Sequence, residues 1–291
     1  MIPASFDYTR PQTVAEAISL LGANPEAKIL AGGHSLVPMM RFRMATPTML
    51  IDINQLEGLS YIKEDGDWLE IGAMTRESEL ETSDLIQKSY PLLADTARVI
   101  ADPLVRNMAT IGGNIAHADP ANDHPATMLA YGAEVTAVGP GGERTIAVGD
   151  FFVDTFETAL AHDEILTAIR IPRAVAGSGG AYLKLERKVG DYATAAVAVQ
   201  IALAKNGKVA SAGIGLTNLG LTPIKASAAE ASLAGGELDD AAVKKAATLA
   251  SEAAEPIADH RGSEEYKRHL VRTLTSRALK KARERAQGGA S

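Results

Sequence analysis

The chain has 291 residues, of which 46% are hydrophobic and 22% are charged, so it can bury a large core in one or two domains. Its net charge of −7 argues against broad nucleic-acid binding, which needs a basic surface. It contains no cysteine, which excludes disulfides, thiolate nucleophiles, zinc–cysteine sites and cysteine-ligated iron–sulfur clusters on this chain.

The segment 1–55 is typical of a small α/β unit. Its apolar spacing predicts a helix over 13–22, with Thr13 as the N-cap and Gly22 as the end. Short strands are predicted over 28–31 and 49–53. The first strand runs directly into the pair Gly32-Gly33, at its carboxyl end, where ligands bind in open α/β sheets.

A second unit is predicted over 56–173. Its strands are expected over 68–72, 134–138 and 164–171, with a hairpin turn at 140–142. Its helices are expected over 84–88, 91–101 and 125–131, the second with Pro91 in its first position. A second glycine pair, Gly112-Gly113, lies between the last two of these helices.

Small and glycine-rich residues predict a linker at 174–180, followed by a third unit at 178–286. Its strands are expected over 182–186, 193–204 and 210–217, and its helices over 226–233, 239–253 and 264–286. The dipeptide Asn206-Gly207 predicts a hairpin between the last two strands. We interpret the many basic residues of the last helix as a solvated face, and we expect 287–291 to be a loose tail.

The two glycine pairs carry the strongest chemical signal. They occur as Ala31-Gly32-Gly33-His34-Ser35 and as Thr110-Ile111-Gly112-Gly113-Asn114. Paired glycines let the backbone adopt positive φ and approach a ligand closely, and successive amides in such turns bind anions. One pair alone is ordinary turn chemistry, but two similar pairs indicate two sides of one phosphate site. Because the chain is acidic, we expect the backbone amides of 32–35 and 111–114 to bind the phosphates.

Several other kinds of site are absent or weakly indicated. There is no Gly-x-Gly-x-x-Gly between a strand and a helix, no phosphate-binding loop of the Walker type and no Gly-x-Ser-x-Gly elbow. A cluster of His117, Asp119, Asp123 and His124 could bind a metal, but its spacing fits no common site, and hydrogen bonding within the loop is the simpler interpretation.

Two further residues leave alternatives open. Lys184 lies on an otherwise apolar strand, where it could serve a ligand or simply point to solvent. Tyr192, which follows Gly190-Asp191, could cover a ligand or belong to ordinary packing.

The two glycine segments, followed by Asp123, resemble the two flavin-adenine-dinucleotide (FAD) motifs of the molybdenum hydroxylase flavoproteins. The segments 2–8 and 187–196 are most similar to the carbon monoxide dehydrogenase branch, and the resemblance covers nearly the whole chain. It implies an α+β fold. The FAD-binding part would be of the vanillyl-alcohol-oxidase/para-cresol-methylhydroxylase type in two α/β subdomains, followed by a C-terminal domain of antiparallel sheet and helices.

The resemblance also implies roles for single residues. The pyrophosphate would lie between the glycine segments, Asp123 would hold a ribose, and Leu166 would contact the adenine or flavin edge through its backbone. Ile100 and Ala101 would lie on one face of the isoalloxazine and Tyr192 on the other, while Lys184 would approach its pyrimidine side. The residues implied to bind FAD are Leu30, Ala31, Gly32, Gly33, His34, Ser35, Leu36, Ile100, Ala101, Thr110, Ile111, Gly112, Gly113, Asn114, Asp123, Leu166, Lys184, Asp191 and Tyr192. No metal ligand and no catalytic residue is expected on this chain.

The implied function is electron transfer within a heterotrimer, or a dimer of heterotrimers, formed with a small iron–sulfur subunit and a large molybdenum subunit. This chain would pass electrons from the clusters to an external acceptor, while a partner oxidises the substrate. The alternatives are the FAD subunit of a related aldehyde or N-heterocycle hydroxylase, a flavin-free structural subunit, and a standalone flavin oxidase. With no leader pattern and no apolar run long enough to span a bilayer, we expect the protein in the cytoplasm or peripheral at the inner membrane through the complex.

Overall fold

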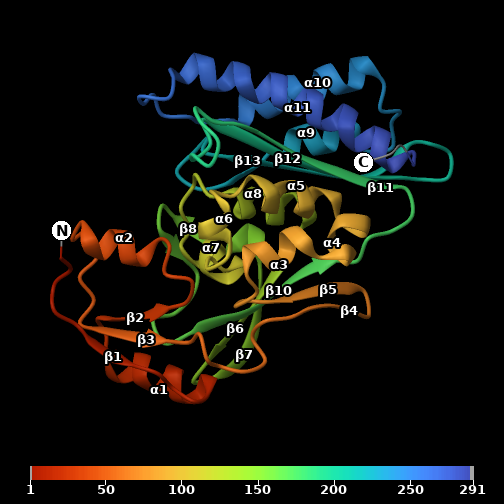
Figure 1. Cartoon of the computed structure of the whole chain (residues 1–291). Coiled ribbons are helices and arrows are strands. Elements are labelled where there is room, and N and C mark those ends of the chain that lie inside the picture. Colours follow the sequence, from red (N-terminus) through yellow and green to blue (C-terminus); the bar gives the residue numbers. More distant parts are fainter. Residues whose placement is uncertain (1, 289–291) are drawn as a thin grey trace.

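The chain forms three α/β parts that follow one another along the sequence, as the computed structural model in Figure 1 shows. The structure describes residues 2–288. Of the predicted loose tail 287–291, the residues after Gly288 therefore lie outside the described residues. The mixed helix-and-sheet architecture confirms the predicted fold class, including the antiparallel C-terminal sheet.

The N-terminal part is a three-stranded parallel sheet with strand order β1-β3-β2. Its elements are β1 (Asp7–Thr9), α1 (Val14–Ala23), β2 (Ala27–Leu30), α2 (Leu36–Arg41) and β3 (Met49–Asp52). The hydroxyl of Thr13 accepts a hydrogen bond from the Glu16 amide, which confirms the predicted N-cap. The predicted end at Gly22 is wrong, because the helix continues to Ala23 and Asn24 caps it.

The middle part is a five-stranded antiparallel sheet in the order β4-β5-β10-β6-β7. Its strands are β4 (Ile62–Asp65), β5 (Trp68–Gly72), β6 (Glu134–Gly139), β7 (Gly142–Ala147) and β10 (Ile165–Pro172), and a separate small ribbon pairs β8 (Phe152–Asp154) with β9 (Glu157–Thr158). The outer strands β4 and β7 were not predicted. They are edge strands of mostly polar composition, so the alternation of apolar residues that marks a half-buried strand is weak in them.

Helices cover one face of this sheet and build the main core with it. They are α3 (Glu77–Thr82), α4 (Asp84–Ser89), α5 (Pro91–Val99), α6 (Pro103–Arg106), α7 (Ile111–Ala116), α8 (Asp123–Tyr131) and the 3₁₀ turn η1 (Val148–Asp150). Helix α8 is buried along almost its whole length, because the C-terminal sheet packs on its other side.

The C-terminal part is a four-stranded antiparallel sheet in the order β11-β12-β13-β14, with helices on its outer face. Its elements are β11 (Ser178–Leu185), β12 (Ala195–Leu203), β13 (Val209–Thr217), β14 (Ile224–Lys225), α9 (Ser227–Leu233), α10 (Asp240–Ala253) and α11 (Glu264–Ala286). The hairpin at Asn206-Gly207 is confirmed, with Gly207 at a φ of 78°. The sheet packs against α9 and α11 on one side and against α5 and α8 on the other, and α10 packs on α9 and α11.

Glycines at the contact surfaces allow this close stacking. A Cβ atom on Gly213 would lie 2.8 Å from the carbonyl carbon of Ala130, and one on Gly215 would lie 2.7 Å from that of Ala126, so α8 could not seat on β13 if either residue had a side chain. The predicted linker at 174–180 is wrong for its last three residues, since Ser178, Gly179 and Gly180 belong to β11. A Cβ on Gly180 would lie 2.8 Å from the Cβ of Leu92.

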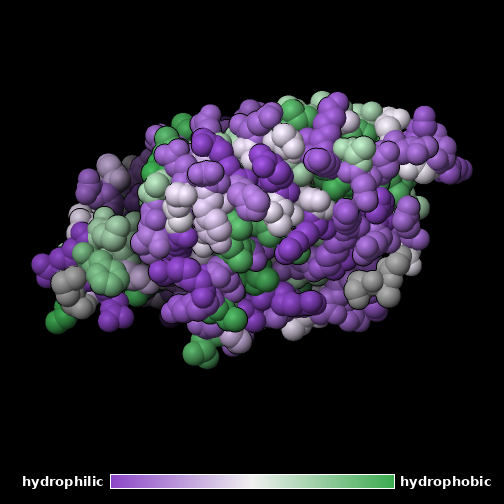
Figure 2. All heavy atoms as spheres, turned by 90° about the horizontal axis from the view of Figure 1, so that it is seen from above, coloured by the Kyte–Doolittle hydropathy of each residue, from purple (hydrophilic) through white to green (hydrophobic). Residues whose placement is uncertain are grey.

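The outer face formed by α10 and α11 is mostly hydrophilic, with hydrophobic residues scattered over it (Figure 2). The interpretation of the basic residues of α11 as a solvated face is only partly right. Lys281 and Arg285 reach inward to the buried carboxylate of Asp95 at 3.0 and 2.7 Å. No helix within residues 2–288 is both long and apolar enough to cross a membrane.

Candidate functional site

The two glycine motifs lie directly against each other. A Cβ atom on Gly32 would lie 2.7 Å from the Cα of Ala109, immediately before the second motif. A Cβ on Gly113 would lie 3.9 Å from the Cβ of Ala31 in the first motif. The structure thus brings together the two segments that were predicted to form the sides of one site.

The two motifs differ in local structure. Gly33 has a φ of 74°, which is the conformation that favours glycine. Gly112 and Gly113, by contrast, lie in the first turn of α7, with Thr110 as the N-cap whose hydroxyl accepts from the Gly113 amide at 3.1 Å. At the second pair the expectation of a turn with positive φ is therefore wrong, because both glycines are helical. Gly112 is required for packing, because a Cβ there would lie 2.5 Å from that of Ala73.

The first motif has free backbone donors. The amides of the five residues from Gly32 to Leu36 donate no hydrogen bond to another described residue. The amides from Ile111 to Asn114 all donate within the protein, to Thr75, Ala73 and Thr110. The amides of 111–114 are thus already used inside the protein, and the unpaired donors suited to an anion lie in the first motif. The contact of both motifs with a phosphate stays a prediction.

Two residues that sequence analysis missed hold the motifs together. The side-chain amide of Asn54 donates to the carbonyl of Ala31 at 2.8 Å. Arg76 donates to the Asn54 side chain at 2.7 Å and also to the carbonyl of Met108, just before the second motif. Burial lowers the pKa of Arg76 from its usual value. Neither residue belongs to a motif, and only the tertiary contact reveals its role.

The residues present fit a dinucleotide with a pyrophosphate. The free amides of the first motif suit phosphate oxygens, and Gly113 adds no side chain between the two motifs. The side-chain oxygen of Asn114 is buried and has no hydrogen-bond partner among the described residues. Such an oxygen can accept a hydrogen bond from a sugar hydroxyl.

Asp123 lies at the start of α8 in a buried polar network. One carboxylate oxygen accepts from the Tyr182 hydroxyl at 2.6 Å and the other from the Lys184 ammonium at 2.9 Å. Lys184 also donates to the carbonyl of Val99 at 3.1 Å, and its side chain is only 3% exposed. The interpretation of Lys184 as solvent-facing is therefore wrong. Burial raises the pKa of the Asp123 carboxyl, while Lys184 and Tyr182 act in the opposite direction.

The turn at Ile100 and Ala101 faces the loop that carries Tyr192. Ala101 has a φ of 44°, an uncommon conformation for a residue with a side chain. Arg106 donates to the carbonyl of Ile100 at 2.9 Å, and a Cβ on Gly190 would lie 3.0 Å from the carbonyl oxygen of Ala101. Tyr192 is 46% exposed beside this contact, so the two predicted flavin faces do come from neighbouring segments.

Asp191 has a structural role in this loop. Its carboxylate accepts from Arg261 at 2.9 Å, from Arg187 at 3.1 Å and from the Tyr192 amide at 2.8 Å. The hydrogen bond from Arg261 is the largest cause that lowers its pKa to about 2. Arg261, which sequence analysis missed, thereby fixes the segment that presents Tyr192.

Leu166 lies in β10 opposite Ala137, next to an irregularity in the strand register, and its side chain belongs to the main core. The contact of its backbone with the cofactor stays a prediction, as do the roles of Asp123 toward a ribose and of Lys184 toward the flavin. His34 is exposed at the edge of the first motif.

The side chains of the cluster considered as a metal site have separate partners. His117 packs on the Phe156 ring with centroids 5.0 Å apart, and His124 pairs with the fully buried Glu77 at 2.7 Å. Within the described part of the chain, no group of three or more His, Asp or Glu side chains is arranged to hold a metal.

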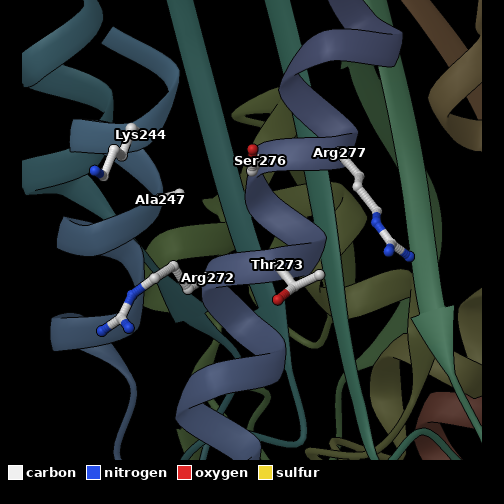
Figure 3. A pocket seen from close by; sticks show the side chains of 6 residues that line it. All are labelled: Lys244, Ala247, Arg272, Thr273, Ser276 and Arg277. Atoms are coloured by element: carbon white, nitrogen blue, oxygen red, sulfur yellow. The ribbon is translucent and has the colours of Figure 1, made fainter. Parts of the chain in front are cut away.

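A cavity of about 300 Å³ lies on the outer side of the molecule, between α10 and α11 (Figure 3). Its lining residues are Lys244, Ala247, Arg272, Thr273, Ser276 and Arg277. Lys244 and Arg277 point in opposite directions in this view, and the C-terminal sheet separates the cavity from the glycine motifs. It is therefore not part of the candidate site.

Two family models match the chain. "FAD binding domain in molybdopterin dehydrogenase" matches residues 4–174, and "CO dehydrogenase flavoprotein C-terminal domain" matches residues 180–282. The first model covers 4–174 as one range, so the predicted division of this part into two subdomains near residue 55 stays a prediction.

Similar proteins span nearly the whole chain. The carbon monoxide dehydrogenase medium chain of Afipia carboxidovorans is 45% identical over 288 residues, covering 99% of this chain and 100% of the relative. The glyceraldehyde dehydrogenase medium chain of Sulfolobus acidocaldarius is 36% identical over 280 residues, covering 96% and 99%. The solved Cu,Mo-CO dehydrogenase matches with a TM-score of 0.95 and 45% identity over 98% of this chain and 100% of that chain. The resemblance found in the sequence is confirmed, and the chain belongs to the FAD-binding flavoprotein family of the molybdopterin dehydrogenases.

Proposed function

We propose that this chain is the FAD-carrying electron-transfer subunit of a molybdenum hydroxylase complex of the carbon monoxide dehydrogenase type. The observation that carries the proposal is the contact between the two glycine motifs, with five consecutive free amides at Gly32–Leu36. The full-length similarity to carbon monoxide dehydrogenase medium chains supports the choice of branch.

Each part of the site has a task in binding the cofactor. The amides of the first motif bind the pyrophosphate, and the side-chain oxygen of Asn114 accepts a hydrogen bond from a sugar hydroxyl. Ile100 and Ala101 would lie on one face of the isoalloxazine and Tyr192 on the other. FAD, when bound, supplies the capacity to accept and release electrons. The ammonium of Lys184, held by its ion pair with Asp123, would lie near the cofactor and would help to stabilise negative charge there.

The electrons must come from other chains. This sequence has no cysteine, so it cannot hold a cysteine-ligated iron–sulfur cluster. The proposed partners are a small iron–sulfur subunit and a large molybdenum subunit, arranged as a dimer of heterotrimers, and substrate is oxidised on the large subunit. The chain passes the electrons to an external acceptor. We propose a cytoplasmic location, with any contact to the inner membrane made through the complex.

A second candidate is the FAD subunit of a related hydroxylase that acts on an aldehyde or an N-heterocycle. The similarity to a glyceraldehyde dehydrogenase medium chain favours this alternative. Because the substrate pocket lies on the partner, the sequence of the large subunit encoded with this chain discriminates between the two. A flavin-free structural subunit is disfavoured, because it would have no use for the free amides of the first motif.

The test is the absorption spectrum of the chain, expressed alone and then mixed with FAD and both partner subunits. We expect flavin absorption bands that grow when FAD is added. We expect these bands to bleach when the two partner subunits are added in their reduced state. Flavin bands only in the complex would mean that partner contacts order the site. A chain that takes up no FAD in either state would overturn the proposal. Turnover by the isolated chain with a small substrate would favour a standalone oxidase.

A further inference from the structure

Tyr182 joins the two domains at a buried carboxylate. It lies on β11, in the domain matched over 180–282, and is 3% exposed. Its hydroxyl donates to Asp123, in the domain matched over 4–174, at 2.6 Å. The same hydroxyl lies 3.0 Å from that of Thr217 on β13, within hydrogen-bond distance. Its backbone amide also donates to Asp95 at 3.3 Å.

Lys184 acts on the same carboxylate from the same strand. Residues two apart on a strand point to the same face, so Tyr182 and Lys184 both reach α8. The Tyr182 hydroxyl donates to one carboxylate oxygen of Asp123, and the Lys184 ammonium donates to the other. A buried carboxylate is costly unless both oxygens are satisfied, and here the C-terminal domain supplies both donors.

The network ends at the predicted flavin face. The Lys184 ammonium donates to the carbonyl of Val99, the last residue of α5, directly before Ile100 and Ala101. The alternative acid for this ammonium is Glu186, whose carboxylate is 3.5 Å away. The Asp123 carboxylate, at 2.9 Å, is the closer partner and holds the ammonium at Val99.

We propose that Tyr182 is a positioning residue of the flavin site, which holds the Asp123 carboxylate and, through it, the ammonium of Lys184 beside the Ile100–Ala101 turn. The C-terminal domain thereby completes the cofactor site rather than only covering it. This inference rests on the proposed function, because it assigns Tyr182 a role toward bound FAD.

The hydroxyl is the part of Tyr182 that matters. Burial raises the pKa of Tyr182 well above its usual value, so the hydroxyl keeps its proton and stays a donor. A Tyr182→Phe change keeps the ring that packs with Ala126 and Ala130. It leaves one oxygen of Asp123 without its partner, so the carboxylate reorients and Lys184 turns toward Glu186.

The test compares Tyr182→Phe with Tyr90→Phe as a matched control. Tyr90 is also buried, at 1% exposure, and its hydroxyl also donates to a carboxylate, that of Glu64 at 2.9 Å, at the opposite end of α5. We expect the FAD dissociation constant of Tyr182→Phe, measured by flavin fluorescence titration, to rise about tenfold. We expect that of Tyr90→Phe to stay within about twofold of the wild type. The midpoint potential of the bound flavin should move only in Tyr182→Phe.

A double-mutant cycle tests whether Tyr182 acts through Asp123. In an Asp123→Asn background, Tyr182→Phe should weaken FAD binding no further, because the carboxylate that it positions is gone. The same loss in both backgrounds, or equal behaviour of the Tyr182→Phe and Tyr90→Phe proteins, would overturn the inference and leave the proposed function standing. A wild-type chain that binds no FAD would overturn the proposed function itself.

Discussion

At the first glycine motif the amides from Gly32 to Leu36 are unpaired within the described chain, whereas at the second those from Ile111 to Asn114 are all used inside the protein. The two motifs look alike in sequence and lie in contact, but one offers donors to a ligand and the other forms the start of a helix. The difference teaches that a repeated glycine pair need not repeat its chemistry. Both pairs allow protein backbone to pack closely, at Ala109 and at Ala73, but only the first pair also belongs to a run of unpaired amides.

The largest effect on the fold is expected at the second motif. A Cβ on Gly112 would lie 2.6 Å from the carbonyl oxygen of Ala73, and backbone cannot move aside cheaply. We expect Gly112→Ala to lower the free energy of unfolding by about 3 kcal/mol, measured by urea denaturation of the FAD-free chain. The control is Gly149→Ala, since among the described residues no atom outside the local backbone would lie within 4 Å of the added Cβ. Equal stability of the two variants would show that the second motif is not a packing element.

The largest effect on the cofactor is expected at Gly113. Within residues 2–288 and outside the helix's own backbone, the atom nearest to a Cβ there is the Thr110 hydroxyl oxygen, at 2.8 Å, and the side chain would project toward Ala31 of the first motif. We expect Gly113→Val to weaken FAD binding by at least about thirtyfold, or roughly 2 kcal/mol, while the thermal midpoint of the FAD-free chain changes little. Purified Gly113→Val protein with its full FAD content would refute the placement of the pyrophosphate between the motifs.

A smaller effect separates backbone strain from ligand binding at the first motif. Gly33 and Gly58 have nearly the same φ, 74° and 77°, but Gly58 belongs to neither motif, and no described atom outside its chain neighbours would lie within 4 Å of a Cβ there. Substitution by Ala should destabilise the FAD-free chain by about 1 kcal/mol at either position. Only Gly33→Ala should also weaken FAD binding, by severalfold. If both variants bind FAD equally, the first motif contributes only a turn, and the contrast between the motifs fails.

The smallest effect is expected in the loop of Asp191 and Tyr192, which lies outside both glycine motifs. The folded-state pKa of Asp191 is lowered to about 2, from an ordinary value near 3.8, so its ion pairs stabilise the fold above the ordinary value. This stabilisation should be lost as the pH falls from about 4 toward 2, and it should be absent at all pH values in Asp191→Asn. Acid titration of unfolding in both proteins measures it. If the free energy of unfolding fell equally with pH in the two proteins, the role of Asp191 in fixing the Tyr192 loop would be contradicted.

Much of the fold follows from local patterns. Strands with a strong apolar run, such as Trp68–Gly72, and helices with clear caps, such as Glu264–Ala286, were predicted because the signal lies within the segment itself. The polar edge strands carry no such signal. Gly179 and Gly180 have linker-like composition, and only the helices packed on them explain why glycine is needed within a strand.

The candidate site divides in the same way. The glycine pairs and Asp123 could be found from sequence because a family motif marks them, and the FAD-binding family is confirmed. Tyr182, Asn54, Arg76 and Arg261 could not, since each acts through partners far away in the chain. The individual contacts of the predicted residues with FAD stay predictions.

The close packing of α8 on Gly213 and Gly215 of β13 limits where the chain can be divided. Asp123–Ala130 is buried between two sheets that belong to different domains, so cutting the chain at the connection 173–177 would leave a bare helix face on one half and a bare sheet on the other. A protease could nick that connection without releasing either piece. For the same reason, neither half would make a dependable recombinant fragment, and the gene is best kept whole in any attempt to engineer the flavin site.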